Sequence, residues 1–290
     1  MKKIAIITGA SSGLGKEFTK QVASMNYDSF DEIWIIARRE DKLNQVAEEI
    51  NTANNFEKIR PVVMDISGKI GVENFKFFLE VEALKCNPTG GLEIGLLINN
   101  AGFGTYGPFI ETSVQKEMDM VDLNCTTVTG ICGFAIPYMN KGAMIINTAS
   151  LAAFMPLGNF AVYAATKAYV LSFSIALSAE LKEKGIRVSA LCPGSVSTEF
   201  ANVASNGARK EVKGGIEPNA VVSHCLKRAY KGKKTSVLLF KWKFNAFLSR
   251  IVGRYTVARA TFKYNKRPHT PEAPKENVEK KEDGMAEGTH

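Results

Sequence analysis

Thr8-Gly9-Ala10-Ser11-Ser12-Gly13-Leu14-Gly15 is the stretch of sequence that decides the fold of this chain. It lies between an apolar run over residues 4–7 and a helical pattern over residues 16–25, so its three glycines form a strand-to-helix turn. Glycines let the backbone approach a pyrophosphate closely, and the amino end of the helix attracts the negative charge. The spacing Gly-x-x-x-Gly-x-Gly differs from the common Gly-x-Gly-x-x-Gly fingerprint. The turn indicates a phosphate site in the right context, although taken alone it could be only a tight connection.

Short runs rich in Ile, Val and Leu recur along the chain, as buried parallel strands do. They cover residues 4–7, 33–37, 59–64, 96–98, 144–147, 188–192 and 237–240. Helical patterns between them include residues 16–25, 42–50, 114–139 and 161–184. Strands that alternate with helices predict a single-domain α/β fold. We expect a Rossmann-type, doubly wound parallel sheet in a three-layer α/β/α arrangement.

Composition sets limits on the class of protein. The 290 residues, 45% of them hydrophobic, suffice for one catalytic domain with a full core. Five scattered cysteines without a Cys-x-x-Cys pair and three dispersed histidines predict neither a disulfide framework nor a metal site, and His224 is expected on a helix face. The first residues leave no room for a signal peptide, and no run approaches 18 apolar residues. We therefore expect a cytoplasmic protein.

The net charge of +8 is concentrated near the carboxyl end. From Lys227 to Arg267 there are thirteen Lys or Arg residues and no Asp or Glu. We divide the chain into a catalytic domain over residues 1–240, a basic amphipathic helical segment over residues 241–267, and a disordered tail over residues 268–290, which is rich in Pro, Glu, Lys and Gly.

The basic segment from Lys241 to Phe262 has its apolar side chains at helical spacing, and Gly253 is expected to divide it into two helices. Such a helix can lie on an anionic membrane as a peripheral contact. It can equally cover a substrate cleft or pack on a partner subunit, and we favour this docked arrangement. Nucleic acid is not an expected partner, because the chain has a basic face without a recognised binding motif.

The end of the second predicted strand indicates which cofactor binds. Residues 35–39 read Ile-Ile-Ala-Arg-Arg, with no acidic residue to bind the ribose hydroxyls of NAD. Arg38 can instead accept the additional 2′-phosphate of NADP through charge-assisted hydrogen bonds. The alternative, arginines that only begin a solvated helix beside Glu40 and Asp41, explains the charge but not the missing acid.

A tyrosine and a lysine stand four positions apart in a long helical pattern. This spacing puts Tyr163 and Lys167 on one face of the helix, where a neighbouring cation favours the phenolate and lowers the pKa of the phenol. Ser150 comes just after the predicted strand at residues 144–147, so its hydroxyl faces the sheet edge where ligands of open α/β sheets bind. The three side chains together predict a proton relay to a carbonyl oxygen.

With the glycine turn, these motifs resemble the short-chain dehydrogenase/reductase family in its single-domain form, from Lys3 to about Leu239. The resemblance implies that Asn124 completes a catalytic tetrad with Ser150, Tyr163 and Lys167 and holds a water that links Lys167 to solvent. It implies coenzyme contacts from Gly9, Ser11, Ser12, Gly13, Leu14, Gly15, Arg38, Arg39, Asp65, Ile66, Asn100, Ala101, Gly102, Tyr163, Lys167, Pro193, Gly194, Val196 and Thr198.

The chain departs from the family pattern at one position. Members that prefer NADP often carry a second basic residue just before the middle glycine, where this chain has Ser12. This leaves Arg38, with Ser11, to hold the 2′-phosphate of NADP(H). The family further implies a homodimer or homotetramer.

Apolar side chains border the predicted site. They occupy most of residues 151–160, and Phe103, Tyr106 and Phe109 follow the asparagine motif at Asn99. Neither stretch has an Arg or Lys to hold a substrate carboxylate, so the pattern favours a bulky, hydrophobic ketone or alcohol such as a steroid or bile acid. The expected substrate contacts are Ser150, Phe103, Phe154, Phe160 and Tyr163.

Three functions are compatible with these observations. The favoured one is an NADP(H)-dependent oxidoreductase that interconverts a bulky ketone and a secondary alcohol. The second is a reductase of 3-oxoacyl thioesters, for which the basic face would bind an acidic carrier protein. The third is a catalytically idle nucleotide-binding scaffold at a membrane, against which the intact set of Asn124, Ser150, Tyr163 and Lys167 argues.

Overall fold

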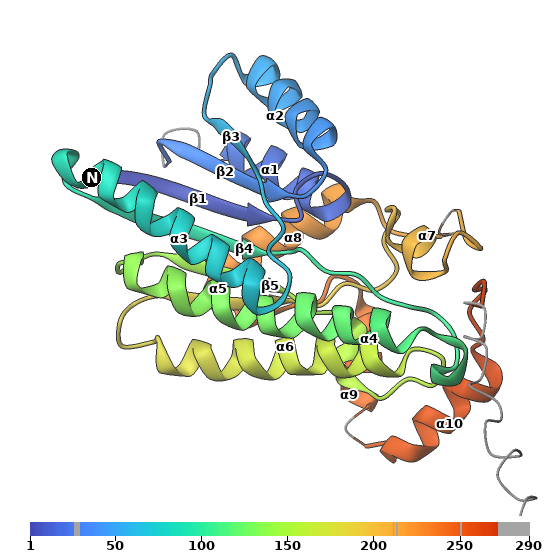
Figure 1. Ribbon diagram of the computed structural model, residues 1–290. Coiled ribbons are helices and arrows are strands. Elements are labelled where there is room, and N and C mark those ends of the chain that lie inside the picture. Colours follow the sequence, from blue (N-terminus) through green and yellow to red (C-terminus); the bar gives the residue numbers. More distant parts are fainter. Residues whose placement is uncertain (26–29, 211, 213, 250, 272–290) are drawn as a thin grey trace, which may run out of the picture.

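One seven-stranded sheet organises the structure, a computed structural model that describes residues 1–25, 30–210, 212, 214–249 and 251–271. All neighbouring strands are parallel, in the order β3-β2-β1-β4-β5-β6-β7 (Figure 1). The strands are β1 Lys2–Thr8, β2 Glu32–Ala37, β3 Ile59–Val63, β4 Leu92–Asn99, β5 Met144–Thr148, β6 Arg187–Leu191 and β7 Thr235–Ser236. The order reverses between β1 and β4, so the predicted doubly wound, Rossmann-type fold is confirmed.

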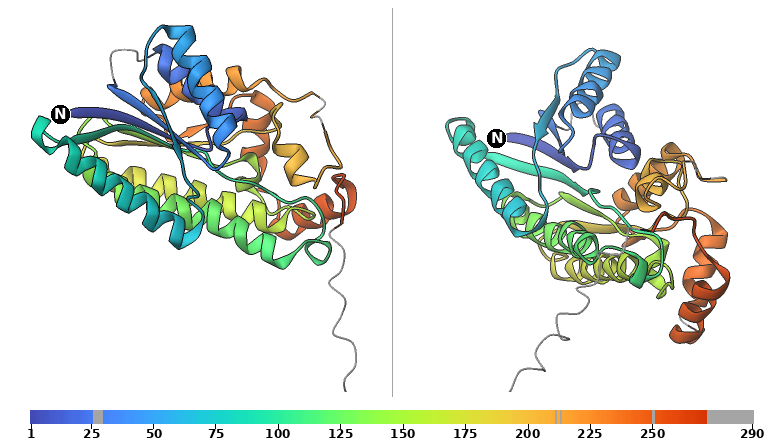
Figure 2. Two further views of the ribbon diagram at one scale, coloured as in Figure 1. Left: turned by 45° about the horizontal axis from the view of Figure 1, so that its top comes forward. Right: turned by 45° about the vertical axis from the view of Figure 1, so that its right-hand side comes forward.

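Helices cover both faces of the sheet in the predicted three layers. They are α1 Gly13–Met25, α2 Glu40–Asn54, α3 Gly68–Cys86, α4 Val114–Val121, α5 Thr127–Ala135, α6 Ala161–Glu180, α7 Phe200–Ala204, α8 Pro218–Tyr230, α9 Phe240–Leu248 and α10 Arg254–Tyr264. Helices α1, α2 and α8 contribute to the apolar cluster on one face, and α3, α5 and α6 to the cluster on the other (Figures 1 and 2).

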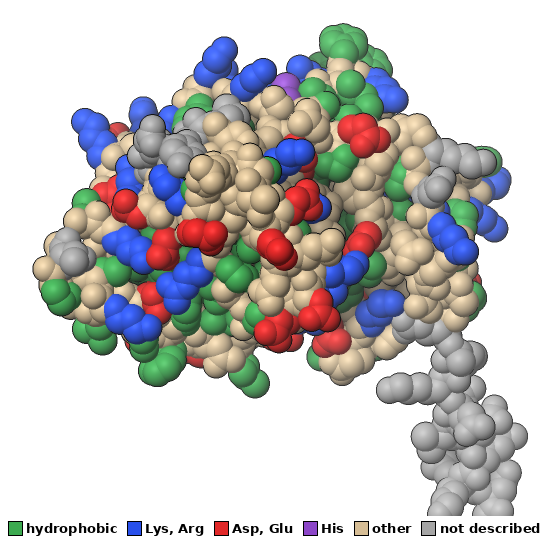
Figure 3. Space-filling model, turned by 90° about the horizontal axis from the view of Figure 1, so that it is seen from above, with side chains coloured by type: hydrophobic (Ala, Val, Ile, Leu, Met, Phe, Trp, Pro, Cys, Tyr) green, Lys and Arg blue, Asp and Glu red, His purple; other side chains and the backbone are tan. Residues whose placement is uncertain are grey.

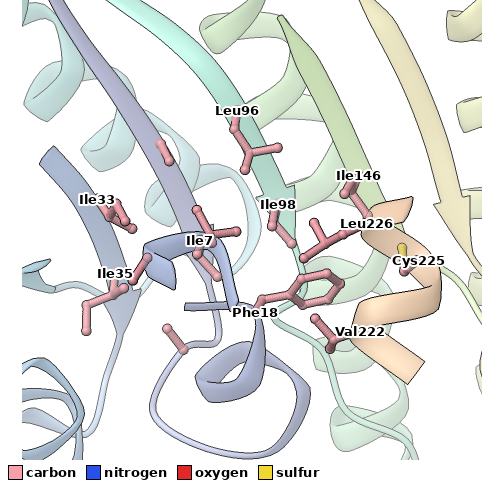
Figure 4. Close-up of a cluster of buried hydrophobic side chains, with 14 of the residues drawn as sticks. Ile7, Phe18, Ile33, Ile35, Leu96, Ile98, Ile146, Val222, Cys225 and Leu226 are labelled. Carbon is pink, nitrogen blue, oxygen red and sulfur yellow. The ribbon is translucent and has the colours of Figure 1, made fainter. Parts of the chain in front are cut away.

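The alternation of side chains along β1 explains why two layers of helices are needed. Ala5 and Ile7 point into one cluster, while Ile4 and Ile6 point into the other, and all four are fully buried. On the first face, Phe18 of α1 packs with Val222 and Leu226 of α8 over the strands (Figure 4). Burial of each large aliphatic or aromatic side chain contributes about 1.5–3 kcal/mol relative to exposure.

Two predicted elements differ from the observed ones. The strand predicted at residues 237–240 is wrong, because the paired residues are Thr235–Ser236 and Phe240 already begins α9. Val237 is apolar because it is buried in a cluster with Trp242 of α9, not because it belongs to a strand. The single helix predicted at residues 114–139 is interrupted by a π-helical turn over Asp122–Thr126 and ends in a 3₁₀ turn.

The basic carboxyl-terminal segment forms two helices, as predicted. Gly253 directly precedes α10 and separates it from α9. Both views in Figure 2 place these orange and red helices at the end of the molecule where the strands end. Of the predicted tail, residues 272–290 lie outside the described residues. His269 and Thr270, at its start, make defined contacts, so disorder does not begin at Pro268.

Candidate active site

A cleft of about 1250 Å³ opens at the carboxyl ends of the strands. It is larger than the roughly 300–1,000 Å³ typical of a pocket for one small ligand. A hollow with acidic and basic side chains near its rim is visible in Figure 3. The predicted site residues that line the cleft are Gly9, Ser11, Ser12, Gly13, Leu14, Arg38, Arg39, Asp65, Ile66, Asn100, Ala101, Gly102, Phe103, Ser150, Phe160, Tyr163, Lys167, Pro193, Gly194, Val196 and Thr198.

The remaining predicted residues lie behind or away from the cleft surface. Gly15 supports the turn from behind, and Asn124 is fully buried. Phe154 is absent from the lining and packs against the cluster around Val170, so its expected substrate contact is not supported. Phe109, which was expected to border the site, is 51% exposed at the surface. The aromatic residues that do face the cleft include Phe103 and Tyr106.

The glycine turn is shaped for close approach by a ligand and by its own helix. Gly9 has a φ of +66°, and its N–H donates to the Ile36 carbonyl at 2.8 Å. A Cβ on Gly15 would lie 2.1 Å from the Gly9 carbonyl oxygen, so only glycine lets α1 begin here. Asn100 Nδ2 donates to the carbonyls of Thr8 and Gly9 and fixes the turn against the end of β4. These features fit a bound pyrophosphate at the start of a helix.

A cluster of charged side chains lies beside the turn at the end of β2. Arg39 donates to Ser11 Oγ and Ser12 Oγ at 3.1 and 2.9 Å and pairs with Glu199 at 3.0 Å. The hydrogen bond from Lys42 and the contacts with Arg39 lower the pKa of Glu199 to about 2. Arg38, the residue singled out from the sequence, instead faces Asp65 at 3.8 Å. Arg39, which the family resemblance implied as a coenzyme contact, is thus the guanidinium that lies next to Ser12.

Ser150 and Tyr163 meet at the floor of the cleft. Ser150 follows β5 and hydrogen-bonds the Tyr163 side chain, while its Oγ also accepts from the Ala152 N–H at 3.1 Å. Tyr163 stacks on Phe160 with ring centroids 4.1 Å apart and is 7% exposed. Burial raises the pKa of Tyr163 above its ordinary value, and the Ser150 hydrogen bond opposes this only in part. The expected lowering of the Tyr163 pKa by a neighbouring cation is therefore wrong, because desolvation dominates.

Lys167 lies one helical turn after Tyr163 on α6, as predicted. Its Nζ donates to the Thr148 carbonyl at 2.8 Å and lies 5.7 Å from the centroid of the Tyr163 ring. Burial lowers the pKa of Lys167 to about 8, because little water reaches the ammonium group. By length and composition α6 would pass as a membrane span, but half of its apolar window is buried and it forms one wall of this site.

Asn124 occupies the π-helical turn between α4 and α5. Its Nδ2 donates to the Phe103 carbonyl and to Thr166 Oγ1, both at 3.0 Å, and its Oδ1 accepts from the Phe103 N–H at 3.2 Å. Through these bonds it ties the strand-end loop after β4 to α6. Single π turns are frequent at functional sites. The water contact expected of Asn124 stays a prediction.

Several residues of the cleft came from parts of the sequence that had no motif. Trp242 of α9 lies against Gly194, where a Cβ would be 2.3 Å from the indole ring. Phe200 of α7 tilts against Tyr163 at 5.4 Å between ring centroids. Arg267, beyond α10, lies over the rings of Phe160 and Tyr106. The favoured arrangement, in which the basic segment covers the cleft, is thus observed for the inner side of α9.

Comparison with known sequences identifies relatives of this chain. A family model described as short chain dehydrogenase matches residues 3–208. An uncharacterized oxidoreductase of Staphylococcus epidermidis is 28% identical over 76% of this chain and 90% of its own length. The 17-beta-hydroxysteroid dehydrogenase type 3 of Mus musculus is 32% identical, covering 72% of this chain and 65% of its own. A very-long-chain 3-oxoacyl-CoA reductase of Anas platyrhynchos is 30% identical, covering 81% and 75%.

Solved structures show the same fold. A short-chain dehydrogenase from Sphingobium yanoikuyae in complex with NADPH has a TM-score of 0.71 at 24% identity and covers 87% of this chain and 94% of its own. A short-chain dehydrogenase/reductase from Burkholderia phymatum in complex with NAD has a TM-score of 0.73 at 22% identity, covering 94% and 98%. At these identities the structures support the fold, and they include both forms of the nicotinamide cofactor.

Proposed function

The chain belongs to the short-chain dehydrogenase/reductase family, and we propose that it is an NADP(H)-linked oxidoreductase that interconverts a bulky, apolar ketone and its secondary alcohol. The observation that carries this proposal is the meeting of Ser150, Tyr163 and Lys167 at the floor of a cleft whose opposite end is a glycine turn. When bound, the nicotinamide cofactor supplies or accepts the hydride. The chain's own residues position the carbonyl and handle its proton.

In this mechanism the carbonyl oxygen accepts hydrogen bonds from Ser150 and Tyr163. Burial keeps the Tyr163 phenol protonated, which suits a proton donor in the direction of reduction. The two hydroxyls stabilise the negative charge that develops on oxygen, because they are fixed before the reaction begins. Lys167 holds positive charge near the phenol ring and favours the phenolate that remains after proton transfer. Asn124 holds the loop after β4 against α6 through its hydrogen bonds to both.

The preference for NADP rests on the cations at the end of β2. Many NADP-preferring members have a basic residue at the position of Ser12, and here the guanidinium of Arg39 lies beside Ser12 instead. Arg38 lies nearby, where it faces Asp65. Glu199 pairs with Arg39 and Lys42, so binding of a 2′-phosphate there has to displace or share these ion pairs. Guanidinium groups bind phosphate well through paired hydrogen bonds.

The substrate is proposed from the wall of the cleft. Near Tyr163 this wall is formed by apolar and aromatic side chains, namely Phe103, Tyr106, Leu151, Ala152, Met155, Leu157, Phe160 and Phe200. A steroid-like or bile-acid ketone fits such a wall. Reduction of a 3-oxoacyl thioester is the second candidate, favoured by the similarity to very-long-chain 3-oxoacyl-CoA reductases.

The outer surface suggests two partners. Exposed apolar side chains on α4 and α6, among them Met118 and Tyr169, support a homodimer or homotetramer. On α9 and α10 the exposed side chains of Phe244, Phe247 and Tyr255 stand in a stretch with no acidic residue. Aromatic side chains among cations suit an anionic lipid surface, so we propose peripheral membrane contact here.

Oxidation of NADPH, followed by its absorbance, tests the enzymatic function against steroid ketones, bile-acid ketones and 3-oxoacyl thioesters. We expect turnover of at least one apolar ketone, and a loss of about a hundredfold or more in Tyr163→Phe with cofactor binding retained. Tyr169→Phe, an exposed tyrosine of the same helix, is the control. Unchanged activity in Tyr163→Phe would refute the mechanism, and absence of any turnover would refute the function.

A further inference from the structure

Residues 265–270 follow α10 and run along the cleft, and we call this segment the strap. Its first four residues, Asn265 to Pro268, line the same cavity as Tyr163. The strap lies beyond residues 3–208, the part of the chain that the family model matches. The family model therefore does not describe the strap.

Helix α10, which leads into the strap, is held by the turn that precedes α6. The Gly158 N–H donates to Thr261 Oγ1 at 2.9 Å, and Asn159 Nδ2 donates to the Phe262 carbonyl at 3.1 Å. A Cβ on Gly158 would lie 2.4 Å from Phe262 Cβ, so α10 and this turn approach closely. The turn leads directly into Phe160 and Tyr163, which couples the position of α10 to the floor of the cleft.

The other end of the strap is held by the loop after β4 and by the end of α7. His269 Nε2 lies 2.8 Å from Glu111 Oε2, and its ring packs where a Cβ on Gly107 would be 2.7 Å away. The Thr270 N–H donates to the Ser205 carbonyl at 3.1 Å. Two anchored ends leave the residues between them little freedom, so the place of Arg267 is defined by the fold.

Arg267 brings a cation to the aromatic side chains beside Tyr163. Its Cζ lies 4.6 Å from the centroid of the Phe160 ring and 5.0 Å from that of Tyr106. Phe160 in turn stacks on Tyr163 at 4.1 Å, so the guanidinium carbon is less than about 9 Å from the centroid of the Tyr163 ring. Among the described residues, no Asp or Glu carboxylate pairs with Arg267. A guanidinium stacked on rings keeps its N–H edges available for an anion.

We infer that Arg267 is a specificity-determining residue that binds the carboxylate of an acidic, apolar carbonyl substrate while Tyr163 and Ser150 engage its ketone oxygen. This inference rests on the proposed function and narrows its substrate class. It also corrects the expectation that the wall offers no cation to a substrate carboxylate, since Arg267 arrives from a distant part of the chain. A planar guanidinium matches a carboxylate by paired hydrogen bonds.

The short span between Arg267 and Tyr163 selects among acidic substrates. A keto acid whose apolar body separates the two polar groups can contact both residues at once. In a 3-oxoacyl-CoA thioester the phosphates lie a full pantetheine arm away from the reacting carbonyl, too far to reach Arg267 from the same pose. The geometry therefore favours a free carboxylate over the phosphates of coenzyme A.

The test compares a bile-acid ketone with its methyl ester, in which a neutral ester replaces the charged carboxylate. Turnover of each is measured with NADPH for the wild type, Arg267→Gln and Arg267→Lys. Arg259→Gln is the matched control, because Arg259 is an exposed arginine of α10 outside the cleft lining. We expect Arg267→Gln to lose about tenfold to a hundredfold in kcat/KM for the acid, through KM, and little for the ester. Arg267→Lys should keep part of the activity on the acid, and Arg259→Gln should resemble the wild type.

Equal use of acid and ester by the wild type would overturn the inference, as would equal losses on both in Arg267→Gln, which would show a packing role. A greater loss on a 3-oxoacyl-CoA than on the acid would also overturn it. If the wild type reduces neither acid nor ester, the proposed function fails for these ketones. Calorimetric titration of the NADPH-loaded protein with the bile-acid ketone then decides the inference alone. Binding that weakens tenfold or more in Arg267→Gln supports it, and binding that is absent or unchanged refutes it.

Discussion

Replacement of Lys167 by methionine is expected to stabilise the fold while it abolishes turnover. Lys167 is 4% exposed, and burial lowers its pKa from 10.5 to about 8. One pKa unit corresponds to about 1.4 kcal/mol, so holding the protonated ammonium in this site at neutral pH costs about 3 kcal/mol of folding free energy. Methionine fills a similar volume without a charge, and loss of the hydrogen bond to the Thr148 carbonyl, about 1 kcal/mol, offsets part of the gain. The variant should be more stable by about 2 kcal/mol.

The sign of the pH dependence follows from the lowered pKa. Between about pH 8 and pH 10.5 the unfolded chain binds more protons at this lysine than the folded protein does, so the wild type gains stability relative to the variant as the pH rises. The advantage of Lys167→Met is complete below about pH 8 and disappears toward pH 10.5.

Equilibrium unfolding in urea without cofactor, at about pH 7 and about pH 10, measures this difference. Lys182→Met, at an exposed position after α6, is the control and should change stability little at either pH. A Lys167→Met variant less stable than the wild type at neutral pH would refute the reasoning, and so would an advantage that does not shrink as the pH rises.

Three further changes test the cofactor region and the outer surface. Arg38→Asp should shift preference from NADPH toward NADH by about tenfold or more in the ratio of kcat/KM values, and an unchanged ratio would contradict the NADP assignment. Glu199→Gln removes the ion pair that occupies Arg39, so NADPH should bind severalfold more tightly while NADH binding is unchanged; calorimetry measures both. Phe244→Ser combined with Phe247→Ser should reduce co-sedimentation with phosphatidylglycerol vesicles, and equal sedimentation of variant and wild type would exclude the proposed membrane contact.

Local patterns account for what could be predicted of the fold and the site. Alternation of apolar runs and helical stretches predicted the doubly wound sheet, because each element buries a face with its own period. The glycine turn and the spacing of Tyr163 and Lys167 span at most two turns of chain, so their geometry follows from the strand-to-helix connection and from 3.6 residues per helical turn. Ser150 was predicted because parallel strands all end at one edge of the sheet.

The directions of neighbouring side chains were not predictable in the same way. Arg38 and Arg39 are adjacent in sequence, but only Arg39 reaches Ser12, since a change of one residue reverses the direction of a side chain at a strand end. Phe154 ends a 3₁₀ turn and packs against the apolar cluster around Val170, whereas Met155, the next residue, lines the cleft. The pKa of Tyr163 depends on how much water its surroundings exclude, and spacing to Lys167 carries no information on burial.

The sequence by itself therefore determined the class of fold, the phosphate turn and the relay of Ser150, Tyr163 and Lys167. Only the tertiary structure decided what surrounds that relay, above all that Arg267 lies over Phe160 and close to Tyr163. Helical and strand periodicity encodes contacts within one element. Arg267 and Phe160 stand 107 positions apart, so their contact depends on how the folded chain holds α10 at Gly158 and the strap at Glu111.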